Sequence, residues 1–560
     1  MKNKFKIFSI ISVIFAGIWL TMFSHFEMGG ESWGYWYFAR VFAETGKFII
    51  MDRGPLYVLY LNLFRWLGYP LSVSVEFFMT SLIVVVSLIV FFRRYLGLAL
   101  AVFSSLLWLP FLQTTEPPVQ GLALALSCLA MSARNKSGGR FCVSLSYCLF
   151  FLAYTLRSIY IIFIVLFALR DIFCFLKATK GKISLMKLLP KPGNWPILFG
   201  VLLFLWFSFN QSSNQWNNAW FATTKWAPNL GKTLSDSSFL QHFNWKFIEL
   251  KYGNFAGRDF YFTNQELFKG ADTALKAVLS NPQFVIEQVG RNIKDLTLIL
   301  VGFTKLSVLI KLFSCFSFTF YLALLISGFI IYGAIRACKE SLMRLFLVGN
   351  LLLAGITVLS LPKARYMQPM IPVFVLSAYF YGTRICSALK NKYSLTFCSL
   401  ILPLVIILFS NGIGNWRVLS TDVIRDIRNG QARILENRNF SMKAAYGKIA
   451  PLLKNCKGVM ALEATFVGAF MDIPINRVYD VWEIPPFGSF GPQAQYKGLQ
   501  PERVNCLLIS NDLMTGIGAA TNYGIRYQNY IKPYSYKIKS EGARVYNLDS
   551  FGALVILNKS

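Results

Sequence analysis

The chain has 560 residues, of which 55% are hydrophobic and 16% aromatic. This composition and a mean hydropathy of +0.49 exclude a mostly soluble protein and predict a polytopic α-helical membrane protein. The formal net charge of +30 would suit nucleic acid. The basic residues are scattered through short loops, however, so we expect no nucleic acid partner.

Apolar segments that could cross about 30 Å of hydrocarbon recur through residues 1–410. Placing the Lys/Arg-rich loops in the cytoplasm gives a consistent topology of about eleven transmembrane helices, with the N-terminus inside and the C-terminus outside. No small-residue cleavage site follows the first segment, which we therefore expect to be a retained anchor. The expected spans are residues 7–23, 73–92, 96–112, 119–133, two short helices within 141–175, 195–209, 316–332, 345–361, 369–381 and 395–410.

The first outer loop, residues 24–69, is rich in aromatic, arginine and carboxylate side chains. Residues 35–48 have apolar side chains at helical spacing, and Pro55 opens a second short amphipathic helix. Such helices lie in the plane of the membrane interface. Glu31 follows two glycines, where a flexible backbone can bring a carboxylate close to a bound group.

Three further segments interrupt the pattern of spans. Residues 141–175 are too long for one span and are broken at Arg157, so we predict two short helices that meet at the outer face. Residues 210–296 form a large polar outer loop. Residues 298–313 are apolar but contain two lysines, and we place them at the interface.

From residue 411 to 560 the composition becomes that of a soluble domain. A helix is predicted at 441–453 and strands at 458–462, 506–510, 543–548 and 553–557, which indicates an α/β or α+β domain. The ten cysteines show no metal-ligand spacing. Cys456 and Cys506 could pair if this domain is outside the cytoplasm, and two isolated thiols are the alternative.

Under this topology, polar residues from different loops converge at the outer membrane face, as they would in an active site. Glu31 is the candidate general base, and Glu116, fixed by two following prolines, is a second candidate acid. The alternative is that both carboxylates are only solvated. The other members of the constellation are Asp52, Arg53, Arg157, Lys363, Arg365 and Tyr366.

The cations of this set suit a phosphate. An ionisable side chain near a membrane is costly without a partner, and Arg157 could bind phosphate or snorkel to the interface. Lys363 and Arg365 could hold a phosphate leaving group or anchor lipid headgroups. Only two histidines are present, and GxxxxGK[ST] and GxGxxG loops are missing, so neither a zinc site nor a nucleotide donor is predicted.

Four short motifs resemble the GT-C superfamily of membrane glycosyltransferases, which includes the lipid A aminoarabinose transferase and the protein O-mannosyltransferases. They are Glu31 in the first outer loop, the helix GPLYVLYLNLF at 54–64, Glu116 in TTEPP, and ARYMQPMIP at 364–372. The resemblance covers residues 1–410.

The resemblance implies a sugar donor on a polyprenyl phosphate and transfer with inversion at the outer face. Glu31 would deprotonate the acceptor, Arg365, Lys363 and Arg157 would hold the phosphate, and Glu116 would orient the donor or a basic residue. Many members have Asp at the first acidic position, so Glu27, Glu44 and Asp52 stay open as the base. No cofactor is predicted as obligatory, and a divalent metal stays open.

The sequence therefore predicts an enzyme of the bacterial inner membrane that transfers a hexosyl or pentosyl group to an O-antigen-like or other lipopolysaccharide acceptor. Its C-terminal domain would be periplasmic. Expected partners are membrane lipids, the polyprenyl-phosphate sugar, the glycan acceptor, a donor-synthesising enzyme and a flippase. The alternatives are a protein O-glycosyltransferase, a polymerase or ligase of lipid-linked glycans, and a lipid-linked sugar flippase.

Overall fold

The computed structural model describes the chain in separate parts. They are residues 30–46, 55–106, 108, 119–134, 139–178, 199–202, 243, 247, 250–251, 265–271, 274–302, 340–360, 368–373, 375–377, 379–380, 438–461, 464–480, 504–510, 531–548 and 552–556. Within them the structure is predominantly helical, with one β-sheet near the C-terminus.

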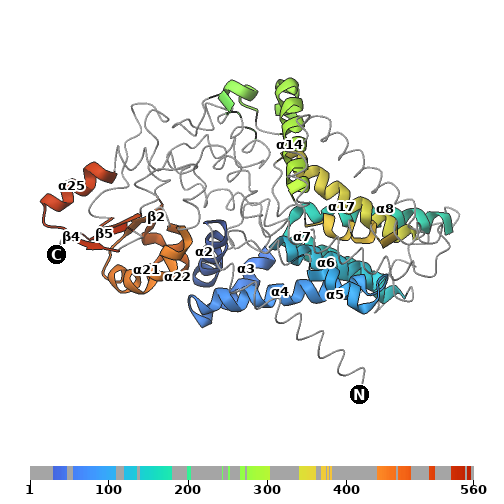
Figure 1. The fold of residues 1–560 in the computed structure, drawn as a ribbon, viewed down its shortest axis with the longest axis horizontal. Coiled ribbons are helices and arrows are strands. Elements are labelled where there is room, and N and C mark those ends of the chain that lie inside the picture. The colour runs from blue at the N-terminus through green and yellow to red at the C-terminus, as the bar shows by residue number, and fades with distance from the viewer. Residues whose placement is uncertain are drawn as a thin grey trace, which may run out of the picture.

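The helices of the N-terminal part follow the apolar segments of the sequence. They are α2 Gly30–Thr45, α3 Pro55–Asn62, α4 Leu71–Phe92, α5 Leu98–Leu106, α6 Val119–Arg134, α7 Arg140–Leu156, α8 Ile161–Ala178 and α17 Ser341–Ser360, with the short helices η1 Arg65–Leu67 and η3 Ser158–Tyr160. The expected helices at 35–48 and after Pro55 are confirmed as α2 and α3. Figure 1 shows α4 to α8 and α17 gathered into one helical layer.

The core of this layer is aromatic. The rings of Phe150 and Phe163 stack 5.5 Å apart, and Phe346 of α17 stacks on Phe163 at 5.2 Å. These side chains are fully buried. Their burial joins α7, α8 and α17, which are distant in the sequence.

Among the described residues, α4 is the one helix that combines sufficient length and apolarity to cross a membrane. Shorter apolar helices lie at Val119–Arg134, Phe141–Leu156 and Ser341–Ile356. The expected spans at 7–23, 316–332 and 395–410 lie outside the described residues, so the number of spans stays a prediction. Two helices, α13 Ala274–Ser280 and α14 Pro282–Gly302, occupy the part of the chain expected as a polar loop and the segment after it.

The C-terminal part contains a five-stranded sheet with the order β2-β1-β3-β5-β4. β1 pairs in parallel with β2 and β3, and β5 pairs antiparallel with β3 and β4. The strands are β1 Val459–Ala461, β2 Val478–Asp480, β3 Cys506–Ser510, β4 Arg544–Asn547 and β5 Gly552–Ile556, and the helices are α21 Arg438–Leu453, α22 Ala464–Phe470 and α25 Lys532–Ser540, with the short helix η10 Ile475–Arg477. All four predicted strands and the predicted helix are confirmed, whereas β2 was not predicted.

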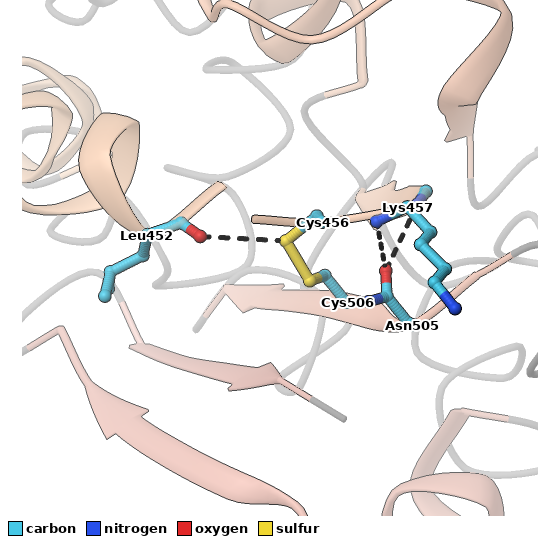
Figure 2. The surroundings of a disulfide bond; sticks show 6 residues. Leu452, Cys456, Lys457, Asn505 and Cys506 are labelled. Carbon is cyan, nitrogen blue, oxygen red and sulfur yellow. Dashed lines mark hydrogen bonds between the residues drawn. A yellow bond between two sulfur atoms is a disulfide. The ribbon is translucent and has the colours of Figure 1, made fainter. Parts of the chain in front are cut away.

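A disulfide joins Cys456, just before β1, to Cys506 at the start of β3 (Figure 2). The Cα atoms are 5.8 Å apart. Beside it, the side-chain oxygen of Asn505 accepts hydrogen bonds from the backbone N–H groups of Lys457 at 2.7 Å and Gly458 at 3.1 Å. The Sγ of Cys456 lies 3.8 Å from the carbonyl oxygen of Leu452; a disulfide sulfur carries no proton, so this is a contact and not a hydrogen bond.

Candidate active site

The predicted site residues divide into two groups. Glu31 is the second residue of α2, so its backbone lies at a helix N-terminus, where a carboxylate is favoured by the helix dipole. Arg157 is described with its side chain. The remaining six, Asp52, Arg53, Glu116, Lys363, Arg365 and Tyr366, lie outside the described residues.

Arg157 lies at a break between two helices, as the sequence predicts. Its backbone is extended, with φ −147° and ψ 115°, and its N–H donates to the carbonyl of Ala153 at 2.9 Å to end α7. The carbonyl of Arg157 accepts from the N–H of Tyr160 at 3.0 Å, which opens η3 and α8. Its side chain is buried, with 8% exposed. A guanidinium buried at a helix break suits the binding of an anion.

Next to Arg157, the side chain of Tyr160 is 1% exposed, and its hydroxyl has no hydrogen-bond partner among the described residues. A buried hydroxyl without a partner is costly. This donor was not singled out from the sequence, because a tyrosine in an apolar segment also suits simple packing.

Two described residues that are near Glu116 and Arg365 in the sequence contact each other. The indole Nε1 of Trp108 donates a 3.0 Å hydrogen bond to the side-chain oxygen of Gln368, and both side chains are buried. Trp108 also packs on the first turn of α6, where a Cβ on Gly121 would lie 2.2 Å from the indole ring. Only a glycine fits this approach.

This contact is close in the sequence to a predicted acid and a predicted cation. Glu116 stands three residues before Val119, the first residue of α6, and Arg365 stands three residues before Gln368. The Trp108–Gln368 contact therefore joins described residues that are near Glu116 and Arg365 in the sequence, and a shared site for the acid and the cation stays a prediction.

Two helices of the segment expected as the first outer loop, α2 and α3, pack on the same layer. The ring of Tyr35 in α2 lies edge-on to that of Tyr57 in α3, with centroids 5.0 Å apart. α3 contacts α7, the helix that ends at Arg157. Tyr35 is four residues after Glu31, so both positions lie on the same face of α2.

A buried acid holds α3 against α4. Glu76 is 2% exposed, and its Oε1 accepts hydrogen bonds from Tyr57 at 3.0 Å and Thr80 at 2.9 Å. Thr80 also lies 3.0 Å from the hydroxyl of Tyr60. Burial, and then the adjacent acid, raise the pKa of Tyr57 well above its ordinary value, so this phenol stays protonated and donates. The signal for Glu76 was available as the one acid in the expected span at 73–92.

α2 also touches the C-terminal part of the chain. The guanidinium of Arg40 donates to the carbonyls of Gly468 at 3.1 Å, Ile473 at 2.8 Å, and Met471. Its Nε bonds Glu44 at 2.6 Å. Aromatic rings surround the contact, including Trp33 and Tyr69 against Phe466, each at 5.2 Å.

Among the described residues, no three His, Cys, Asp or Glu side chains form a group that could hold a metal ion. Asp52 and Glu116 lie outside these residues. A requirement for a divalent metal thus stays open.

No family model matches the sequence, and no curated protein matches it. The chain is similar to the solved structure of ArnT from Cupriavidus metallidurans in the apo state, at 13% identity over 99% of this chain and 98% of that chain, with a TM-score of 0.38. It is also similar to ArnT from the same organism bound to undecaprenyl phosphate, at 11% identity over 98% and 97% of the chains, with a TM-score of 0.43. ArnT belongs to the GT-C superfamily, which the sequence motifs of this chain resemble. Because identity and TM-score are low, this likeness assigns no residue roles to this chain.

Proposed function

We propose that this protein is an inverting glycosyltransferase that moves a sugar from a polyprenyl-phosphate donor to an envelope glycan at the periplasmic face of a bacterial inner membrane. The observation that carries the proposal is the Trp108–Gln368 contact. It supports a shared site for Glu116 and Arg365, an acid and a cation from segments about 250 residues apart in the sequence.

In the proposed reaction, Glu31 takes the proton from an acceptor hydroxyl while the oxygen attacks the anomeric carbon. The bond between that carbon and the phosphate oxygen breaks, and the polyprenyl phosphate leaves with its electron pair. Arg157, Lys363 and Arg365 stabilise the charge that develops on the phosphate. Asp52, Arg53, Glu116 and Tyr366 orient the donor.

The proposed membrane setting is supported by side chains on the helical layer. Leu169, Ile172 and Phe173 of α8 are 56% to 68% exposed, which is unfavourable in water and favourable in lipid. Arg94, at the end of α4, lies 3.6 Å from Glu340 just before α17, so two ends expected in the cytoplasm are close together. The Cys456–Cys506 disulfide suits an oxidising periplasm for the C-terminal part.

The test is the envelope glycan profile, by mass spectrometry, of cells that express the intact protein, Glu31→Gln, Arg157→Gln or no protein at matched membrane levels. A sugar-sized increment that needs the intact protein would support the proposal. We expect both variants to lose it. Arg344→Gln, which alters an exposed arginine at the start of α17, serves as the matched control and should keep it.

The profile also separates the alternatives. If Glu31→Gln retains the increment, the general base is Glu27, Glu44, Asp52 or Glu116 in place of Glu31. An increment on protein, in place of glycolipid, would indicate a protein O-glycosyltransferase. No increment, together with movement of lipid-linked sugar by the purified protein in vesicles, would indicate a flippase.

A further inference from the structure

We propose that the C-terminal part of the chain contributes to the transferase site by holding α2, the helix that carries Glu31, in position through contacts with Arg40. In this role Arg40 is a positioning residue and not a catalytic one. The inference rests on the proposed function for its reaction, whereas the contact itself stands on the structure.

Arg40 of α2 contacts residues that are more than 400 positions away in the sequence. Its Nη1 and Nη2 atoms donate to three backbone carbonyls at the end of α22 and in the turn after it, Gly468, Met471 and Ile473. The last carbonyls of a helix have no partner within it and carry partial negative charge. A buried guanidinium fork therefore satisfies several acceptors at once, which a lysine could not do.

The packing around this contact leaves little freedom. A Cβ on Gly468 would lie 2.6 Å from the ring of Tyr37, so α2 and α22 approach each other closely. Trp36 packs against Phe470 at 5.7 Å. Arg40 also bonds Glu44 one turn along its own helix, which holds its Nε while the other end of the fork reaches α22.

This docking has a direct consequence for Glu31. Glu31 precedes Arg40 by nine residues on the same helix, a distance of about 13 Å along the axis. A rotation or shift of α2 would displace a base at its N-terminus, and a misplacement of about 1 Å can cost about a hundredfold in rate. The contact with α22 thus sets the position of the base.

The test compares purified full-length protein with Arg40→Gln, Arg40→Lys and Arg477→Gln, using a synthetic polyprenyl-phosphate sugar and the acceptor glycolipid identified by the glycan profile. Arg477 is exposed and lies four residues beyond Ile473, so its variant is the matched control. We expect Arg40→Gln to lower kcat at least tenfold with little change in the KM for the donor, Arg40→Lys to recover part of this, and Arg477→Gln to match the intact protein. Unchanged kcat in Arg40→Gln overturns the inference.

A cross-link separates positioning from general loss of structure. Replacing Tyr37 and Gly468 with cysteine in the Arg40→Gln background allows a disulfide between α2 and α22, verified by mass spectrometry. We expect the cross-linked protein to regain kcat and the matched variant with Tyr37→Cys alone not to regain it. Failure of a formed cross-link to restore kcat overturns the positioning role.

Hydrogen exchange distinguishes failure of this inference from failure of the proposed function. If the intact protein transfers no sugar, the proposed function fails. Faster exchange in residues 30–45 of Arg40→Gln would then still establish the docking, and unchanged exchange there would overturn it.

Discussion

The hydroxyl of Tyr57 donates a 3.0 Å hydrogen bond to the carboxyl group of Glu76, and both side chains are buried. The bond joins α3 to α4. α3 begins at Pro55, two residues after Arg53 in the sequence, so this pair holds the helix that follows Asp52 and Arg53 against α4.

Tyr57→Phe should destabilise the protein. The substitution keeps the ring but leaves Glu76 with one fewer hydrogen-bond donor in a buried place, a loss of about 1 to 3 kcal/mol in the free energy of unfolding. Thermal unfolding in detergent measures it. Tyr536→Phe, at a tyrosine that is 60% exposed, should change stability by no more than about 0.5 kcal/mol, and an equal loss in both variants would contradict the role of the Glu76 bond.

Tyr69 should make stability depend on alkaline pH. Burial, and then Tyr446, raise the pKa of Tyr69 to about 12, above the ordinary value of about 10 for an unfolded tyrosine. The folded state then binds the proton more tightly, so this contribution is present below pH 10 and is lost as pH rises from about 10 toward 12.

The measurement is the free energy of unfolding of the intact protein and Tyr69→Phe between pH 8 and pH 11. Relative to Tyr69→Phe, the intact protein should lose about 1 to 2 kcal/mol across the alkaline range, less than the full linkage value because the ring is partly exposed. Parallel pH curves for the two proteins would count against the prediction.

Loss of the disulfide should destabilise the sheet. Cys456 and Cys506 are 50 residues apart in the sequence, and opening a loop of that size costs up to about 4 kcal/mol through the entropy of the unfolded chain. Cys456→Ser with Cys506→Ser should therefore make residues 438–556 more sensitive to protease. Cys174→Ser, at a free and exposed cysteine, should leave the cleavage rate unchanged.

Two ion pairs should differ sharply in their contribution to the free energy of unfolding. Asp171 of α8 pairs with Arg134 of α6, whose side chain is 3% exposed, and also accepts a 2.8 Å hydrogen bond from Tyr147 of α7. Asp171→Asn leaves the buried guanidinium of Arg134 without its carboxylate, and should lower the free energy of unfolding by about 3 to 5 kcal/mol.

The contrasting pair is Arg94 and Glu340, whose side chains are 34% and 45% exposed. Glu340→Gln should lower the free energy of unfolding by at most about 1 kcal/mol, because solvent screens the charges. Thermal unfolding of both variants under the same detergent compares them. A larger loss for Glu340→Gln than for Asp171→Asn would refute this ranking.

Local pattern was sufficient to predict much of the fold. The strand at 506–510 was predicted with its observed bounds, and the break at Arg157 was visible because a charged residue interrupts a segment too long for one span. β2, Val478–Asp480, was missed because only two consecutive apolar residues precede its aspartate, whereas the equally short β1 lies in the apolar run 459–462. Register between distant segments leaves no local signal.

The site was less accessible to sequence reasoning. Glu31, Arg157 and Glu76 stand out as charges beside or within apolar segments, whereas Tyr160 matters through burial, which only the packing of several helices creates. The roles of Asp52, Arg53, Glu116, Lys363, Arg365 and Tyr366 stay predictions. Arg40 was not singled out either, because its acceptors are backbone carbonyls more than 400 residues away.

The bond from Arg40 to the carbonyl of Ile473 spans 433 positions of the chain. At about 5 to 20 residues per second of synthesis, the ribosome makes Ile473 roughly 20 to 90 s after Arg40. The contact between α2 and Ile473 therefore cannot form until most of the protein has been synthesised. A chain that stops short of α22 would leave the aromatic face of α2 uncovered, so truncated products should be recognised by quality-control proteases at this helix.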